Sequence, residues 1–146
     1  MNDTNKLQRF LDAQSRAYEL ALQEIKDGQK RSHWVWYIFP QLKGLGSSPT
    51  SEFYGISGLE EARAYYDHPV LGKRLIEITE ALLGHNDKSA REILYRDAKK
   101  VRSCMTLFWV ASGNPLFKTV IDTFYDGKMD GKTINRTGGT PPSFTE

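Results

Sequence analysis

The spacing of apolar residues along the chain predicts a series of amphipathic helices. Over residues 4–27, apolar side chains recur every three or four positions and therefore share one helical stripe. Three further stripes begin near Pro69, Asp97 and Asn114, and each is followed by a glycine, which commonly ends a helix. These stripes predict helices over residues 69–83, 97–112 and 115–126.

The segments between these stripes carry weaker signals. Residues 32–39 are apolar almost throughout and stop at Pro40, so the segment is buried whether it forms a strand or a helix. We expect a short helix, because no partner strands are visible elsewhere. Residues 41–54 are rich in glycine, serine and proline and predict a loop. Capping-box patterns at residues 57–60 and 89–92 predict short helices over residues 58–67 and up to residue 95.

These elements together predict an all-α fold class, with a single irregular multihelical domain of six or seven helices. We expect this domain to cover residues 1–136, because no linker or internal repeat interrupts the pattern. Residues 137–146 have no periodicity and predict a disordered, flexible C-terminal tail. The length of 146 residues is enough to bury one hydrophobic core.

Composition and charge exclude several functional classes. The chain has 20 basic and 18 acidic residues, a net charge of +2, which is a weak signal for nucleic-acid binding. A single cysteine rules out an internal disulfide and fits a reducing compartment. No apolar stretch approaches the ~18 residues of a membrane span, and the first four residues are polar. We therefore expect a cytoplasmic protein that does not bind membranes.

The first candidate site combines basic, hydroxyl and aromatic side chains around residues 30–41. Basic groups and free backbone N–H groups at a helix start can hold an anion, and neighbouring rings can stack on a base. The alternative is that the tryptophans belong to the core and that Ser32 caps a helix. The residues predicted to bind a ligand here are Lys30, Arg31, Ser32, His33, Trp34, Trp36 and Gln41.

The second candidate site lies at the start of the helix predicted over residues 97–112. Helical phasing aligns Asp97 with the apolar stripe and places Lys100 at its border, near Ser103. Charged groups at the edge of a core are candidates for catalysis, so we predict Asp97 and Lys100 as catalytic and Ser103 as ligand-binding. The alternative is an N-cap aspartate with a snorkelling lysine. Glu61 is a further candidate general base.

Other polar residues give weaker indications. The glycines and serines of residues 44–48 could let backbone amides approach a ligand, although an ordinary surface turn is the simpler interpretation. Cys104 lies in the middle of an apolar stripe, which predicts a core residue. His33, His68 and His85 lack metal-ligand spacing, so we predict no metal site and no cofactor.

Several blocks of the sequence, notably residues 30–41, 68–75 and 97–108, resemble an uncharacterised bacterial family, domain of unknown function 1810. Members of this family are sometimes labelled calpastatin. The resemblance covers nearly the whole chain except the tail and implies an all-helical fold, without supplying an activity. A shorter stretch from Asp97 to Leu116 is similar to the NADAR (NAD and ADP-ribose) superfamily, which is associated with N-glycosidic bonds.

Two functional hypotheses follow from these observations. In the first, the chain binds or hydrolyses a nucleotide-like or ADP-ribose-like molecule at an N-glycosidic bond, with basic residues on phosphate and a carboxylate as general base. It requires residues 30–41 and the start of the 97–112 helix to line the same pocket. In the second, the chain is a non-catalytic module that binds a protein through exposed rings. Those rings would be Phe53, Tyr54, Tyr65 and Tyr66.

Overall fold

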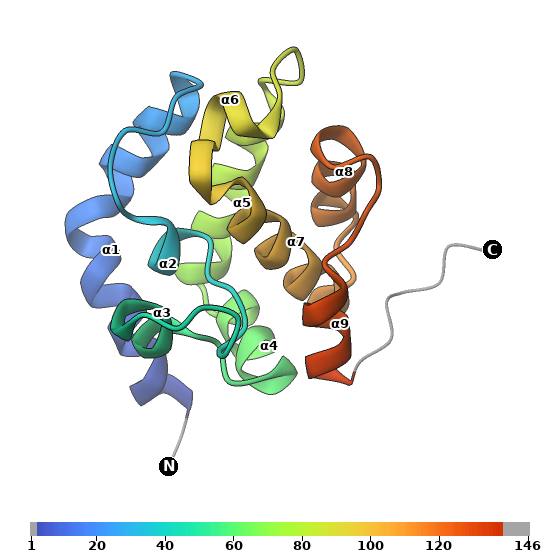
Figure 1. Cartoon of the computed structure of the whole chain (residues 1–146). Coiled ribbons are helices and arrows are strands. Elements are labelled where there is room, and N and C mark those ends of the chain that lie inside the picture. The colour runs from blue at the N-terminus through green and yellow to red at the C-terminus, as the bar shows by residue number, and fades with distance from the viewer. Residues whose placement is uncertain (1–2, 139–146) are drawn as a thin grey trace.

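The structure is a computed structural model that describes residues 3–138, and it confirms the all-α fold class as a single multihelical domain. Apart from one isolated bridge between Leu42 and Ile56, the regular secondary structure in this range is helical. Figure 1 shows α7 (Ala98–Ser112) at the centre, with α1 (Asp3–Lys26) on one side and α8 (Pro115–Phe124) on the other. Helix α7 packs against α8 and against α4 (Leu59–Asp67), while α1 packs against α5 (Leu71–Leu83).

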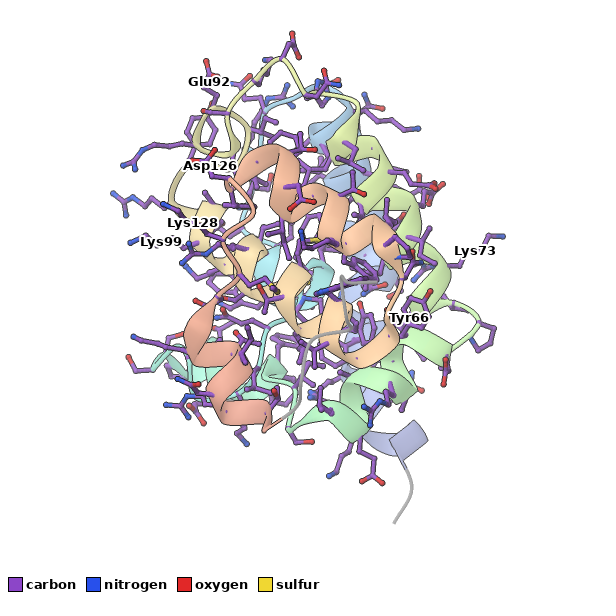
Figure 2. The ribbon with its side chains drawn as sticks, turned by 90° about the vertical axis from the view of Figure 1, so that its right-hand side faces the viewer. Tyr66, Lys73, Glu92, Lys99, Asp126 and Lys128 are labelled. Atoms are coloured by element: carbon purple, nitrogen blue, oxygen red, sulfur yellow. The ribbon has the colours of Figure 1, made fainter. Side chains whose placement is uncertain are left out.

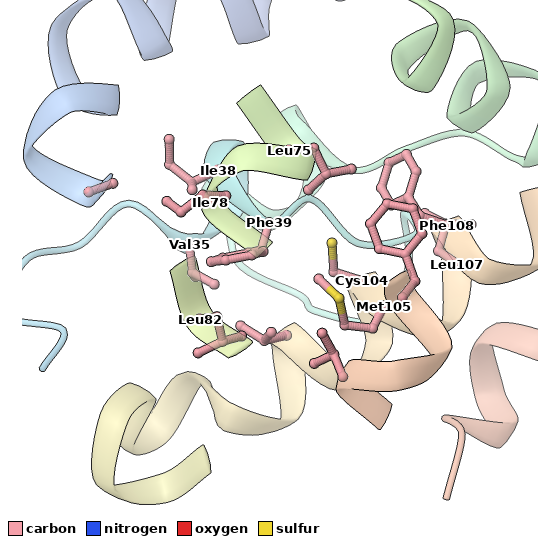
Figure 3. Packing of buried hydrophobic residues seen from close by; sticks show 14 of the residues in the cluster. Val35, Ile38, Phe39, Leu75, Ile78, Leu82, Cys104, Met105, Leu107 and Phe108 are labelled. Carbon is pink, nitrogen blue, oxygen red and sulfur yellow. The ribbon is translucent and has the colours of Figure 1, made fainter. Parts of the chain in front are cut away.

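The hydrophobic core forms where the apolar stripes of these helices meet. From Cys104 to Val110, every side chain of α7 is buried, since neighbouring helices cover this helix on all sides. Figure 3 shows Val35 and Ile38 packing in the same interior as Ile78 and Met105. The first two belong to α2 (Val35–Ile38), which confirms the short buried helix expected within residues 32–39.

The segment predicted as a loop over residues 41–54 contains a helix. Helix α3 (Pro49–Tyr54) begins after Ser48, whose Oγ accepts a hydrogen bond of 3.1 Å from the backbone N–H of Ser51. Proline at the first helical position favours the same start. The loop prediction is therefore wrong for its last six residues, because a serine followed by a proline favours a helix start as well as a turn.

A second helix that the sequence did not predict, α9 (Gly131–Thr137), comes after α8 in the chain. It carries no apolar stripe; instead, the carboxylate of Asp130 accepts hydrogen bonds from the backbone N–H of Thr133 at 3.0 Å and from its hydroxyl at 2.6 Å. This helix includes Thr137, the residue at which the tail was predicted to begin. The rest of the predicted tail, residues 139–146, lies outside the described residues.

Local capping explains the remaining boundaries. Helix α6 (Ala90–Leu94) has the predicted capping box, in which Ser89 and Glu92 exchange hydrogen bonds. The box predicted at residues 57–60 is wrong, because Gly58 is the N-cap of α4 and offers no side chain. Helix α5 begins at Leu71, two residues after Pro69, where the Nδ1 atom of His68 accepts the first backbone N–H groups. None of the helices that the structure describes meets the length and hydropathy required to cross a membrane.

Candidate functional site

An open pocket with a volume of about 360 Å³ lies between the segment that precedes α2 and the start of α7. The two segments that the sequence marked as separate candidate clusters therefore line one pocket. We call it the Lys30–Lys100 pocket. Its lining comprises Lys30, Arg31, Ser32, His33, Trp36, Leu94, Tyr95, Arg96, Asp97 and Lys100.

A buried carboxylate on α1 holds one wall of this pocket in place. Glu24 is only 2% exposed and accepts hydrogen bonds from the backbone N–H of Arg31 at 2.8 Å, the Ser32 hydroxyl at 2.6 Å and the Trp34 indole at 2.9 Å. Burial disfavours the charge of Glu24, but these hydrogen bonds outweigh it and lower its pKa. Glu24 was not predicted from the sequence. Its position three residues after Ala21, at the border of the α1 stripe, was the only indication that it could be buried.

Lys30 forms the floor of the pocket. Its ammonium group pairs with Asp97 at 2.8 Å, donates to the carbonyl of Ser32 and lies 4.8 Å from the centre of the Trp34 ring. Its backbone N–H donates to the carbonyl of Ile93 at 2.8 Å. These contacts leave Lys30 only 8% exposed, so it ties the two walls together more than it presents a free charge.

Asp97 links Lys30 to Lys100 across the pocket. It occupies the N-cap position of α7, but its side chain makes no capping hydrogen bond, so the capping alternative is wrong. Its two oxygens instead pair with Lys30 at 2.8 Å and with Lys100 at 3.2 Å. While both ion pairs are in place, Asp97 positions Lys100 and has neither oxygen free for a reacting group.

Tyr95 and Arg96 form the rim of the pocket and were not predicted. They lie in a short 3-10 turn, η1 (Tyr95–Asp97), between α6 and α7. Tyr95 has φ 54° and ψ −124°, a conformation that strongly favours glycine, and its side chain is 45% exposed. Such strain costs on the order of 1–3 kcal/mol and clusters at binding sites. The only indication in the sequence was that Tyr95 and Arg96 lie between two predicted helices, where side chains are often exposed.

The two tryptophans of the first cluster differ in accessibility. Trp34 is 1% exposed, so its ring cannot stack on a ligand, and the alternative that places it in the core is correct. Trp36 is half-buried and lines the pocket. Its indole nitrogen is itself buried and has no hydrogen-bond partner among the described residues.

Two predicted ligand-binding residues lie on the other side of Lys100. Gln41 and Ser103 line a neighbouring pocket of about 300 Å³, to which Lys100 also contributes. The Ser103 hydroxyl donates to the carbonyl of Lys99 at 3.2 Å, within α7. The structure therefore brings both residues near the Lys30–Lys100 pocket but not into its lining, and Gln41 meets Trp36 only in a separate hollow of about 10 Å³.

Glu61 belongs to a different site. It lines a separate pocket with Arg9, Lys6 and Lys43, and its carboxylate pairs with Arg9 at 3.0 Å. Burial opposes its charge, but hydrogen bonds from Arg9 and from the backbone of Ser57 prevail and lower its pKa. Glu61, predicted as an alternative general base to Asp97, lines none of the cavities that contain Asp97 or Lys100, so it does not belong to that site.

The aromatic residues of the protein-binding hypothesis do not form one surface. Tyr65 is completely buried and packs edge-on against Phe10, with 5.1 Å between the ring centres. The Tyr66 hydroxyl accepts a hydrogen bond from Asn114 at 2.8 Å. Phe53, at 59% exposure, is the most exposed of the four rings, so the patch expected from the sequence is absent from the described surface.

Cys104 is buried in the core as predicted, and burial raises the pKa of its thiol well above its usual value. This excludes a thiolate nucleophile at neutral pH. Within residues 3–138, no group of three or more histidine, cysteine and carboxylate side chains is placed to hold a metal ion.

Comparison with known proteins yields a family without an assigned activity. A search of curated proteins gives no match. Among solved structures, the chain is similar to the conserved hypothetical protein Rv1873 from Mycobacterium tuberculosis, with 43% identity, a TM-score of 0.89 and coverage of 92% of this chain and 97% of that one. The family model described as protein of unknown function (DUF1810) matches residues 4–137. The chain therefore belongs to the DUF1810 family of proteins of unknown function.

Proposed function

We propose that the Lys30–Lys100 pocket binds a phosphorylated, nucleotide-like small molecule of the ADP-ribose type. The observation that carries the proposal is the convergence of Arg31, Arg96 and Lys100 with two accessible rings around one pocket. The pocket is lined by a single carboxylate, Asp97, which is already occupied by two ammonium groups. The remaining cationic groups attract an anion rather than a cation.

The basic groups at the rim suit a phosphate. Arg96 is exposed and forms no ion pair with the described residues, so its guanidinium is free to bind two phosphate oxygens at once. Arg31 pairs with Asp27 at 3.1 Å, but both side chains are exposed. Exposed pairs contribute little to stability, so a phosphate can replace Asp27 at small cost.

The rings suit the other part of a nucleotide. Tyr95 presents its exposed ring at the rim, while its hydroxyl accepts a hydrogen bond from Gln29 at 2.9 Å that orients it. Trp36 adds an apolar wall. Stacking on aromatic rings contributes about 1–3 kcal/mol per base and tolerates any base.

The proposal extends to catalysis, the hydrolysis of an N-glycosidic bond in the bound ligand. This extension depends on Asp97 as the general base. A phosphate that binds Lys100 would compete with Asp97 for the ammonium group and release one carboxylate oxygen. That oxygen would take a proton from the water whose oxygen bonds to the ribosyl carbon, while the carbon–nitrogen bond breaks and the departing base takes up a proton from solvent. Release of free base from ADP-ribose-like or nucleoside substrates, followed by chromatography, tests this form. Asp97→Asn would abolish turnover while retaining binding.

Calorimetric titration and thermal shift with AMP, ADP-ribose and NAD test binding. At 100 times its Kd, a ligand should add about 2.7 kcal/mol to the free energy of unfolding. We expect Arg96→Ala combined with Lys100→Ala to weaken binding at least tenfold. The control, Lys73→Ala, removes an exposed lysine outside the pocket and should leave binding unchanged. Absence of binding by all three ligands would contradict the proposal.

A further inference from the structure

The pocket that shares Lys100 extends the basic surface beyond the proposed nucleotide site. This second cavity, which we call the Lys99–Lys132 pocket, has a volume of about 300 Å³. Helix α7 supplies Lys99, Lys100 and Ser103 on one side, and α9 supplies Lys132. The glycine-rich segment before α3 supplies Leu45 and Gly46. The segment that the sequence indicated as an ordinary turn therefore forms a wall of this pocket.

The charge of this second pocket is positive and largely uncompensated. Lys99 and Lys132 are exposed and form no ion pair with residues 3–138. The single carboxylate of the lining, Asp130, accepts two hydrogen bonds from Thr133 and lies 3.7 Å from the guanidinium of Arg102. The ammonium groups of both lysines are therefore available to an anion that enters this pocket.

The linings of the two pockets are strongly basic, although the net charge of the whole chain is only +2. They are lined by six basic and two acidic side chains, whereas the complete sequence has 20 basic and 18 acidic residues. Figure 2 shows Lys99 projecting from one side of the molecule and Lys73 from the opposite side. A net charge of +2 hides this segregation, which is why the composition gave little indication of polyanion binding.

The spacing of the pockets indicates the length of the ligand. Arg96, in η1, lines only the first pocket, and Ser103, in α7, lines only the second. Helix α7 alone rises roughly 7.5 Å between Ala98 and Ser103. A single phosphate group cannot reach both ends. A chain with one phosphate on each side of a nucleoside can, and the exposed rings lie at the first end only.

Resting on the proposed function, we propose that the Lys99–Lys132 pocket is a second phosphate subsite. The preferred ligand is then a short nucleotide chain, with its terminal base at Tyr95 and Trp36 and its next phosphate between Lys99 and Lys132. A free dinucleotide and the end of a single-stranded nucleic acid share this chemistry. They differ in whether additional nucleotides increase the affinity.

Calorimetric titrations with AMP, 5′-phosphorylated diadenylate and a twelve-nucleotide oligoadenylate test this proposal. Diadenylate should bind at least tenfold more tightly than AMP. Lys99→Ala combined with Lys132→Ala should remove that gain while changing the Kd for AMP by less than twofold. The matched control, Lys73→Ala combined with Lys88→Ala, removes two exposed lysines that line neither pocket and should change neither Kd.

Salt dependence gives a second readout for the same variants. For a single strand, the logarithm of affinity falls with the logarithm of salt concentration by about 0.7 per phosphate contact. Loss of two contacts should make the slope for oligoadenylate shallower by about 1.4. Tighter binding of oligoadenylate than of diadenylate would identify a nucleic-acid end as the ligand, and equal binding a free dinucleotide.

The outcomes separate the two proposals. If AMP binds and diadenylate binds no more tightly, the second subsite is refuted while the nucleotide site stands. The same holds if the gain with diadenylate survives the loss of Lys99 and Lys132. If neither AMP nor diadenylate binds, the proposed function itself fails.

Discussion

Two pockets of this protein hold a carboxylate beside cationic side chains, Glu61 in one and the half-buried Asp97 in the other, yet they differ in how many protein acceptors surround their arginines. In the pocket lined by Arg9 and Glu61, the guanidinium of Arg9 donates to the carbonyls of Phe53, Gly55 and Lys6 as well as to Glu61. In the Lys30–Lys100 pocket, Arg96 has no ion-pair partner among the described residues, and Lys100 is held only by Asp97.

On our proposal, this difference separates a structural ion pair from a binding site. A cation surrounded by protein acceptors has few donors left for a ligand, whereas an exposed cation at an open rim keeps its donors available to water or to an anion. Pocket volume does not distinguish the two, because they measure about 370 and 360 Å³. The hydrogen-bonding capacity left on the arginine of each pocket does, because Arg9 has four protein acceptors and Arg96 has no ion-pair partner among the described residues. The following predictions test this difference.

The largest effect is expected from Glu61→Ala. This change leaves the guanidinium of Arg9, whose side chain is 15% exposed, without its carboxylate partner. Loss of one member of a buried pair destabilises by about 3 kcal/mol, which urea denaturation would measure. Ligand binding at the Lys30–Lys100 pocket should be unchanged in the folded variant. A loss of binding there would show that the two pockets are not independent.

Glu24→Gln should have a somewhat smaller effect on stability but should also weaken binding. The amide can accept some of the hydrogen bonds from Arg31, Ser32 and Trp34, but it brings a donor into a cluster of donors. We expect a loss of about 2 kcal/mol in urea denaturation. The Kd for AMP should rise severalfold, because Glu24 positions the wall that carries Arg31. An unchanged Kd would contradict this positioning role.

Tyr95→Gly should stabilise the protein while weakening ligand binding. Glycine adopts φ 54° without strain, so the gain exceeds the lost hydrogen bond to Gln29 and amounts to about 1 kcal/mol in thermal or urea denaturation. Tyr95→Ala keeps the strain and loses the ring, so it should weaken binding without the gain. If both variants bind AMP as tightly as the unaltered protein, Tyr95 is not part of the site.

The pH dependence of stability should be the smallest effect. The pKa values of Glu24 and Glu61 are lowered in the folded protein by their hydrogen bonds, despite burial. Each therefore contributes stability that is complete above the unfolded value of about 4.3 and is lost as pH falls through the folded value. Urea denaturation between pH 3 and 7 should show this loss below about pH 4.3, and Glu61→Gln should flatten it. An equally steep loss in that variant would assign the effect to other groups.

Sequence patterns predicted what depends on local periodicity. The apolar stripes located α1, α5, α7 and α8, and helical phasing placed Lys100 at the border of the core. The same phasing could not separate Trp34 from Trp36, because a helix of four residues is too short to define a buried face. Helix α9 was missed because it has a cap but no stripe.

Contacts between distant segments were beyond this kind of prediction. Glu61 pairs with a residue 52 positions earlier, and nothing in the local sequence distinguishes this glutamate from a solvated one. Glu24 accepts from residues seven to ten positions later, across the turn that ends α1. Tyr95 owes its exposure to a strained turn, which the sequence around it does not mark.

An NMR titration of the labelled protein with AMP tests the central claim most directly. The indole N–H of Trp36 belongs to a residue that lines the pocket, and Trp36→Phe would assign its signal. The account predicts that this signal and the backbone amides of Tyr95 and Arg96 shift together, with one saturation curve. Shifts confined to residues around Arg9, or none at saturating AMP, would contradict it.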